Sequence, residues 1–187
     1  LEHRRQRQMC IRDSYYAFDA YNETLNSIQK DDILFITLRM PFYFLNSSKD
    51  DIDPDQTLKD WIYSVKELSK KLEKKNANIV ISTPTPEFIN GEILQCKSQN
   101  IQWFNTLGKV SCSEPLNYFS SKNGKYQKII NRLRILSSEN KNIYLFDGLK
   151  AMCPKNECQF SLNNKVLYWD SNHISHYGSK YLSLIHI

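Results

Sequence analysis

An aspartate and a histidine near the end of the sequence have the types and spacing of an acid–base pair. Asp170 and His173 are separated by two residues, just before a stretch that predicts a helix from residue 175. A short loop can present both side chains to one pocket. Neutral imidazole is a competent general base near pH 7, and a carboxylate on its other nitrogen fixes the tautomer. The pair allows proton-transfer chemistry, but it lacks a nucleophile.

The spacing of this pair alone is open to two other interpretations. Asp170 can be a helix cap beside a histidine that is exposed or packed in the core. Asp170, His173 and His176 can also belong to a metal site, although no further ligand is evident.

Alternating apolar segments predict the elements that must position this pair. Three nearly continuous apolar runs indicate buried strands, at 33–38, 77–82 and 143–146. Apolar residues at three- and four-residue spacing predict helices over 54–72 and 126–137. Shorter elements are expected as a helix at 101–107, a helical turn at 149–152, an extended segment at 165–168 and a helix over 175–182. Strand–helix alternation predicts an α/β fold with a parallel sheet.

Arg39 is a candidate anion-binding residue at the edge where such sheets bind ligands. Ligands of parallel sheets bind at the carboxyl ends of the strands, which are followed here by Arg39, Thr83 and Thr85. A guanidinium at this edge could stabilise a developing oxyanion. A surface ion pair with Asp50 or Asp51 is the alternative.

The two ends of the chain do not continue the pattern of the rest. Residues 1–14 (LEHRRQRQMCIRDS) lack a hydrophobic period, and 183–187 close the chain abruptly. Both resemble translated sequencing-adapter sequence, so we expect non-native tails there and one domain over 15–182. A natural basic tail is the alternative. If the tails are foreign, the native protein extends beyond both ends.

The charge and hydropathy of the chain argue against nucleic-acid binding and against a membrane-spanning segment within it. The formal net charge is +5, and residues 1–14 contribute four arginines and two acids, so about +3 remains without them. This charge is too small and scattered to indicate nucleic-acid binding. No apolar run approaches the roughly 20 residues that span a bilayer.

The cysteines indicate an oxidising compartment. Cys10 lies in the suspected tail, which leaves four cysteines, an even number. We expect Cys153 to pair with Cys158 and Cys96 with Cys112, because each pair flanks its own local loop. A zinc site and reduced cytosolic thiols are the alternatives.

The C-terminal block resembles that of SGNH-type hydrolase domains, most closely those fused to integral-membrane acyltransferases of the acyltransferase-3 family. The matching positions are Cys153, Cys158, Tyr168, Asp170, His173–Ile174–Ser175 and Gly178–Ser179. Supporting similarity lies at 31–39 (DDILFITLR) and 80–88 (VISTPTPEF), and Cys96 and Cys112 fall where the family carries a second cysteine pair. Met40–Pro41 stands where the family usually has Trp. The resemblance covers about 16–182 and implies a three-layer α/β/α sandwich of SGNH/flavodoxin-like type.

The chain departs from this family at the nucleophile. The family's nucleophile is a serine in a Gly-Asp-Ser-type turn after the first strand. Asp13–Ser14 mimics part of that turn, but it follows Arg12 and lies in the suspected tail. We therefore expect the first strand and the nucleophilic serine to be missing from this chain.

The resemblance implies an extracytoplasmic O-acyltransferase domain that works without metal or organic cofactor. A membrane domain, expected upstream of this chain, would deliver an acyl group, usually acetyl. The serine would accept it with His173 as base and Asp170 as orienter, and a cell-envelope polysaccharide or related glycan would be the acceptor. A secreted carbohydrate esterase and a non-catalytic glycan-binding or structural domain are the two rivals.

Overall fold

The structure is a computed structural model, and it describes residues 7–9, 16–45, 54–88, 113–121, 126–163 and 165–184. The chain divides into two compact units. The first unit comprises Leu1–Pro84 and Lys128–Phe146, and the second comprises Thr85–Gln127 and Asp147–Ile187. Each is described by itself.

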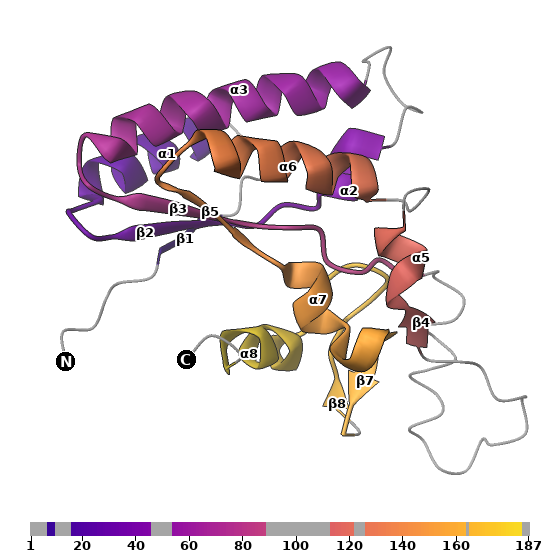
Figure 1. The fold of residues 1–187 in the computed structure, drawn as a ribbon. Helices are drawn as coiled ribbons and strands as arrows, with labels where there is room; N and C mark the ends of the chain where they lie inside the picture. Colours follow the sequence, from indigo (N-terminus) through magenta and orange to yellow (C-terminus); the bar gives the residue numbers. More distant parts are fainter. Residues whose placement is uncertain are drawn as a thin grey trace, which may run out of the picture. The chain divides into compact units, whose positions relative to one another are not determined.

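A parallel sheet forms the centre of the first unit (Figure 1). Its strands, in the order β1-β2-β3-β5, are β1 (Arg7–Met9), β2 (Ile33–Ile36), β3 (Asn78–Ser82) and β5 (Ile143–Phe146). The register places Leu34 beside Ile79 and Ile79 beside Ile143. All three predicted strands are present, and the predicted class, α/β with a parallel sheet, is confirmed.

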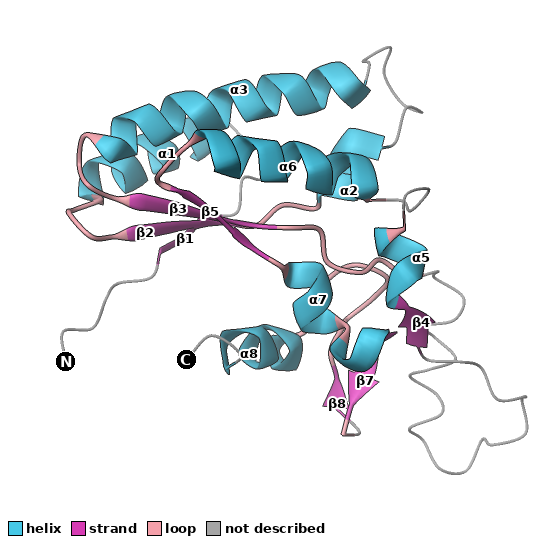
Figure 2. Cartoon of the chain, in the orientation of Figure 1, coloured by secondary structure: helices cyan, strands magenta, loops and turns pink. Residues whose placement is uncertain are grey.

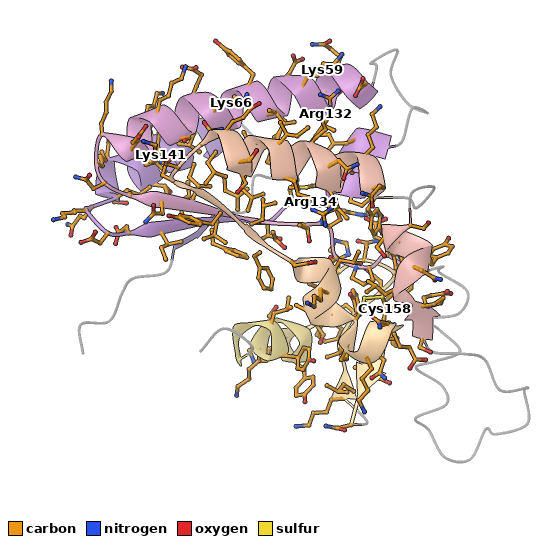
Figure 3. The ribbon with its side chains drawn as sticks, in the orientation of Figure 1. Lys59, Lys66, Arg132, Arg134, Lys141 and Cys158 are labelled. Carbon is orange, nitrogen blue, oxygen red and sulfur yellow. A yellow bond between two sulfur atoms is a disulfide. The ribbon has the colours of Figure 1, made fainter. Side chains whose placement is uncertain are left out.

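In the described part of this unit, four helices accompany the sheet. They are α1 (Tyr16–Ser27), α2 (Met40–Leu45), α3 (Pro54–Glu73) and α6 (Gln127–Glu139). The core of the unit contains Leu58, Val65, Leu68 and Leu72 of α3 and Ile129, Leu133 and Leu136 of α6, packed with Leu34, Ile36, Ile79 and Ile81 of the sheet. Charged residues at the intervening positions, such as Lys59, Lys66 and Arg132, lie outside this core (Figure 3). The two long helices form because their apolar stripes have a sheet to cover.

Helices α1 and α2 were not predicted. The sequence of α2, MPFYFL, is apolar all round, so it has no polar face to reveal a helical period. Met40 and Phe44 are nevertheless buried in the core of the unit. Tertiary packing, rather than amphipathic pattern, therefore explains this helix.

Strand β1 lies within residues 1–14, where we expected a tail and no first strand of the sheet. Arg7, Gln8 and Met9 pair in parallel with Leu34, Phe35 and Ile36. An edge strand needs only main-chain pairing along an open edge, so an apolar period is not required. Residues 10–15, which include Asp13–Ser14, lie outside the described residues.

The two faces of the sheet are not equally buried. Figure 1 shows α1, α3 and α6 on one side of the sheet. The strand order runs in one direction, so right-handed crossovers place successive helices on the same face. On the other face Phe35 is half-buried, and Tyr144 is 52% exposed. Among the described residues of this unit, the two faces therefore differ in burial, because the strand order does not reverse and so carries no helix across.

The second unit combines short strands and short helices (Figure 2). Its elements are β4 (Ser113–Pro115), α5 (Leu116–Ser120), α7 (Gly148–Met152), the 3-10 turn η1 (Pro154–Asn156), β6 (Glu157–Gln159), β7 (Ser161–Leu162), β8 (Lys165–Val166) and α8 (His176–Leu184). Strand β4 pairs antiparallel with β6, and β7 pairs antiparallel with β8. The expected turn at 149–152, extended segment at 165–168 and C-terminal helix are present. The helix expected at 101–107 lies outside the described residues.

Candidate active site

The loop that carries Asp170 and His173 is closed by main-chain pairing in the second unit. Tyr168 and Ile174 form an isolated antiparallel bridge. The Trp169 N–H donates to the His173 carbonyl oxygen at 2.7 Å. Three residues therefore turn the chain between two hydrogen-bonded arms, which fixes the loop despite its exposure.

Within this loop the two predicted side chains are brought together. His173 Nδ1 lies 2.7 Å from Asp170 Oδ2. The other carboxylate oxygen, Oδ1, accepts hydrogen bonds from the backbone N–H groups of Asn172 (3.0 Å) and His173 (2.8 Å). Both oxygens of Asp170 are thus engaged, which holds the carboxylate in one orientation.

This geometry gives His173 a defined chemical role. An ionised carboxylate accepts hydrogen bonds only, so Nδ1 carries the proton shared with Asp170. Nε2 is then the nitrogen with a lone pair, and it can take a proton from a hydroxyl group. The side chains of His173 and Asp170 are 63% and 52% exposed, so a substrate has access to the pair.

The hydrogen bonds to Asp170 also set its acidity. Partial burial would raise the pKa of this carboxyl, but hydrogen bonds from the His173 N–H, the Asn172 N–H and the His173 ring lower it from 3.8 to about 2. Because the pKa of Asp170 is lower in the folded state than in the unfolded state, its ionised carboxylate stabilises the fold. This contribution is fully present above the ordinary pKa of the group and is lost as the pH falls toward 2.

We therefore expect the Asp170 carboxyl to titrate with a midpoint near pH 2. Carbon-13 NMR of the labelled side chain measures this midpoint. In His173→Ala the midpoint should rise, because the ring donor is lost while the backbone donors remain. A wild-type midpoint at the ordinary value of 3.8 would contradict the hydrogen-bonded geometry.

Tyr168, which leads into the loop, packs among buried aromatic rings. Tyr168 is fully buried, with its ring centroid 5.0 Å from that of Phe88 and 6.0 Å from that of Phe160. The Phe88 N–H donates to the Ser171 carbonyl oxygen at 2.8 Å, which ties a distant segment to the loop. Burial, with smaller contributions from Tyr126 and Glu87, raises the pKa of Tyr168 well above its ordinary value, so this phenol stays neutral.

Helix α8 starts immediately after the loop and is fastened to it. Ser175 caps the helix, since its hydroxyl accepts from the Gly178 N–H at 3.0 Å and donates to the Val166 carbonyl at 2.6 Å. The Ser175 N–H donates to the Leu167 carbonyl at 2.8 Å. The family-like Ser and Gly thus join the helix to the strand that precedes the loop.

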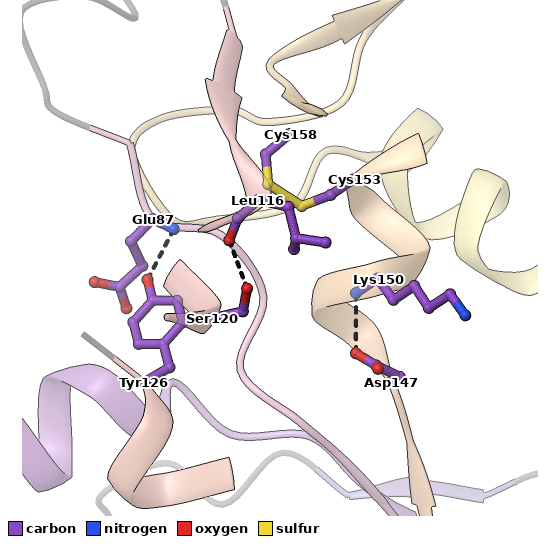
Figure 4. The surroundings of a disulfide bond; sticks show 8 residues. All are labelled: Glu87, Leu116, Ser120, Tyr126, Asp147, Lys150, Cys153 and Cys158. Carbon is purple, nitrogen blue, oxygen red and sulfur yellow. Dashed lines mark hydrogen bonds between the residues drawn. A yellow bond between two sulfur atoms is a disulfide. The ribbon is translucent and has the colours of Figure 1, made fainter. Parts of the chain in front are cut away.

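Cys153 and Cys158 form a disulfide, with Cα atoms 3.8 Å apart (Figure 4). Both side chains are buried. Nearby in the same unit, the Asp147 side chain caps α7 by accepting from the Lys150 N–H, and the Tyr126 hydroxyl accepts from the Glu87 N–H at 3.0 Å. The second predicted pair, Cys96 and Cys112, lies outside the described residues.

Thiol alkylation tests both cysteine pairs. In denatured, unreduced protein we expect Cys153 and Cys158 to resist iodoacetamide, and we predict the same for Cys96 and Cys112. Cys10, which has no predicted partner, should react and serves as the internal positive control. Peptide mass spectrometry locates the modified residues. Reduction of the 153–158 bridge should lower stability by about 2 kcal/mol on the loop-entropy model.

Arg39 belongs to the first unit, whereas His176 is the first residue of α8 in the second unit. Arg39 is exposed between β2 and α2 at the carboxyl end of its strand, in the first unit. The segment with Asp50 and Asp51 is outside the described residues. His176 is exposed at the start of α8. Across the described ranges, no group of three or more His, Cys, Asp and Glu is arranged to hold a metal ion.

Two supporting residues were missed from the sequence. The backbone of Asn172 contributes a hydrogen bond to Asp170, and the asparagine's preference for turns was the available signal. Phe88 was noted only as the end of a family-like strand, and its link to Ser171 spans 83 positions of sequence, which no local pattern reveals.

Comparison with known families gives one match. A family model described as "SGNH domain (fused to AT3 domains)" matches residues 2–185. No curated protein matches the chain significantly. Among the helices that the structure describes, none has the length and apolar character needed to cross a membrane.

Proposed function

Because the chain belongs to the family of SGNH domains fused to AT3 domains, we propose that it is the acyl-transferring domain of an O-acyltransferase. We further propose that the group transferred is acetyl and that the acceptor is a cell-envelope polysaccharide or a related glycan. Family membership supports an SGNH domain of acyltransferase or esterase type with a membrane acyltransferase domain as its partner. The acyl group and acceptor are parts of the proposal.

One observation carries the catalytic part of this proposal. His173 Nδ1 lies 2.7 Å from Asp170 Oδ2, and the other carboxylate oxygen is held by two backbone N–H groups. This arrangement orients the imidazole with Nε2 as the base and stabilises the imidazolium once it forms. A helix cap alone would not require the ring contact.

The proposed reaction has two steps. His173 Nε2 takes the proton of a serine hydroxyl while the serine oxygen attacks the acyl carbon of the donor, and the protonated imidazole returns the proton to the leaving group. The same nitrogen then takes a proton from an acceptor hydroxyl, whose oxygen attacks the acyl carbon of the acyl-serine. The bond to the serine oxygen breaks, and this oxygen takes the proton back from His173 Nε2, which restores the free serine and the neutral imidazole. The covalent intermediate divides one difficult transfer into two easier steps, and no organic cofactor is needed.

We propose that the nucleophilic serine belongs to a segment of the parent protein that residues 1–14 replace. Ser14 follows Arg12–Asp13 rather than a Gly-Asp turn, and Ser171 and Ser175 are engaged in holding the loop and α8. Arg39 is proposed as an anion-binding residue for the developing oxyanion. Unchanged turnover in Arg39→Ala would leave only an ion-pair role for it.

We place the domain on the outer side of a bacterial membrane, tethered to its AT3 domain. The Cys153–Cys158 disulfide supports this location, because structural disulfides persist mainly in oxidising compartments.

A fluorophosphonate probe tests the proposed nucleophile directly. Such probes phosphonylate serines that an adjacent base activates, so no knowledge of the acceptor is needed. We expect the full-length parent protein to be labelled on one serine, with labelling abolished in His173→Ala. We expect the present chain to remain unlabelled. Labelling of Ser14 in this chain would refute the missing-nucleophile part, and labelling of the parent that survives His173→Ala would refute the role of the dyad.

A further inference from the structure

A tryptophan lies exposed beside the acid–base pair. Trp169 precedes Asp170 and is 64% exposed. Single exposed apolar residues are common on proteins and need no explanation by themselves. The exposure of Trp169 matters here because of where this residue lies relative to His173.

Strand pairing places the Trp169 and His173 side chains on the same side of the loop. Tyr168 and Ile174 are bridge partners, so Trp169 and His173 form the next directly opposite pair, joined by the 2.7 Å hydrogen bond between them. Side chains of an opposite pair lie on one face, with Cβ atoms about 4.5–5.5 Å apart, and successive residues alternate between faces.

The burial of the four side chains follows this alternation. Tyr168 is fully buried and Ile174 is half-buried on one face, while Trp169 and His173 are both about two-thirds exposed on the other. The loop therefore presents an indole and an imidazole together toward solvent. The backbone hydrogen bond fixes the two Cα positions, so their spacing is set before any ligand binds.

We propose that Trp169 is a positioning residue for the acceptor: its indole is the platform on which a pyranose ring stacks, so that a ring hydroxyl reaches His173 Nε2. This inference rests on the proposed glycan acceptor. A pyranose has an apolar C–H face and a rim of hydroxyls. An exposed aromatic ring binds the face while polar groups beside it bind the rim, as aromatic side chains do where one side is apolar and the other wet.

Saturation-transfer NMR of the 187-residue chain tests this role without requiring catalysis. The probes are maltotetraose, cellotetraose, chitotetraose and mannotetraose. We expect at least one probe to receive saturation on its pyranose C–H protons from the wild type, and this transfer to fall about tenfold in Trp169→Ala. Trp169→Phe should retain most of it, because a flat aromatic face remains. Tyr63→Ala is the matched control, since Tyr63 is an equally exposed aromatic (67%) on α3 of the other unit.

Two outcomes would overturn the inference. The first is equal transfer from wild type and Trp169→Ala, and the second is no transfer from the wild type to any of the four probes. Superimposable urea-unfolding curves for wild type and Trp169→Ala show that the variant is folded, as expected for a side chain that is mostly exposed. If Trp169→Ala unfolds early, the comparison is made with Trp169→Thr, and unchanged transfer there would equally refute the role.

The same measurement separates this inference from the proposed catalysis. In His173→Ala the saturation transfer should persist within about threefold, because the platform remains, whereas fluorophosphonate labelling of the parent is lost. If His173→Ala is still labelled while glycan binding still depends on Trp169, only the catalytic proposal is refuted. If the parent protein is labelled in a His173-dependent way but glycan binding does not depend on Trp169, only the proposed role of Trp169 is refuted.

Discussion

Replacing His173 with alanine is expected to lower acetyl release by the parent protein by about 10²–10⁴-fold, the usual contribution of a positioned general base. The structure gives the reason: His173 is the residue whose Nδ1 is held by Asp170, which leaves Nε2 to move the proton. Release of nitrophenol from nitrophenyl acetate by the full-length protein measures the effect. KM for this small ester should change little, because the imidazole acts in the transition state rather than in binding.

Asp170→Asn should produce a loss of similar size by a different route. An amide nitrogen in place of Oδ2 would donate to Nδ1, so the ring proton would move to Nε2 and the base would be blocked. His176→Ala is the matched control, because His176 is an exposed histidine three residues further on, at the start of α8. Equal activity in wild type and His173→Ala, or an equal loss in His176→Ala, would remove the basis for assigning the dyad.

Gly178→Ala is expected to be the most destabilising small substitution near the site. A Cβ atom at Gly178 would lie 2.2 Å from the Leu167 carbonyl oxygen and 2.6 Å from a methyl carbon of Ile174. The nearest of these is backbone, so the conflict cannot be relieved by a side-chain rotation. Helix α8 must instead move away from the strand that leads into the Asp170–His173 loop. Overpacking of this kind costs about 3 kcal/mol or more.

Urea unfolding of Gly178→Ala and of Ser179→Ala measures this cost. Ser179 is the next residue, is exposed and occupies the same helix, so its substitution should change stability by less than about 0.5 kcal/mol. Because Ser175 and Leu167 connect the helix to the loop, Gly178→Ala should also weaken the Asp170–His173 contact, visible as a higher Asp170 midpoint in NMR. A variant as stable as wild type would show that α8 does not pack this closely on Leu167.

Much of the first unit could be predicted from local pattern. The three strands appear because each is a short, nearly continuous apolar run, and α3 and α6 appear because their apolar residues recur with the helical period. Strand β1 and helix α2 escaped prediction, since one depends on main-chain pairing and the other on apolar packing without a polar face. The unequal burial of the sheet's faces follows from strand order, which no single run encodes.

In the second unit, what the sequence predicts and what the folded structure adds can be separated most clearly. The sequence alone was enough to identify Asp170 and His173 and their spacing, the nearby cysteine pair, and the family that they indicate. The folded chain was needed to see that two backbone N–H groups hold Asp170, that Phe88 anchors the loop, and that Trp169 shares a face with His173. The physical reason is that hydrogen bonds and strand register join residues distant in the chain, whereas spacing reports only what one short segment can reach.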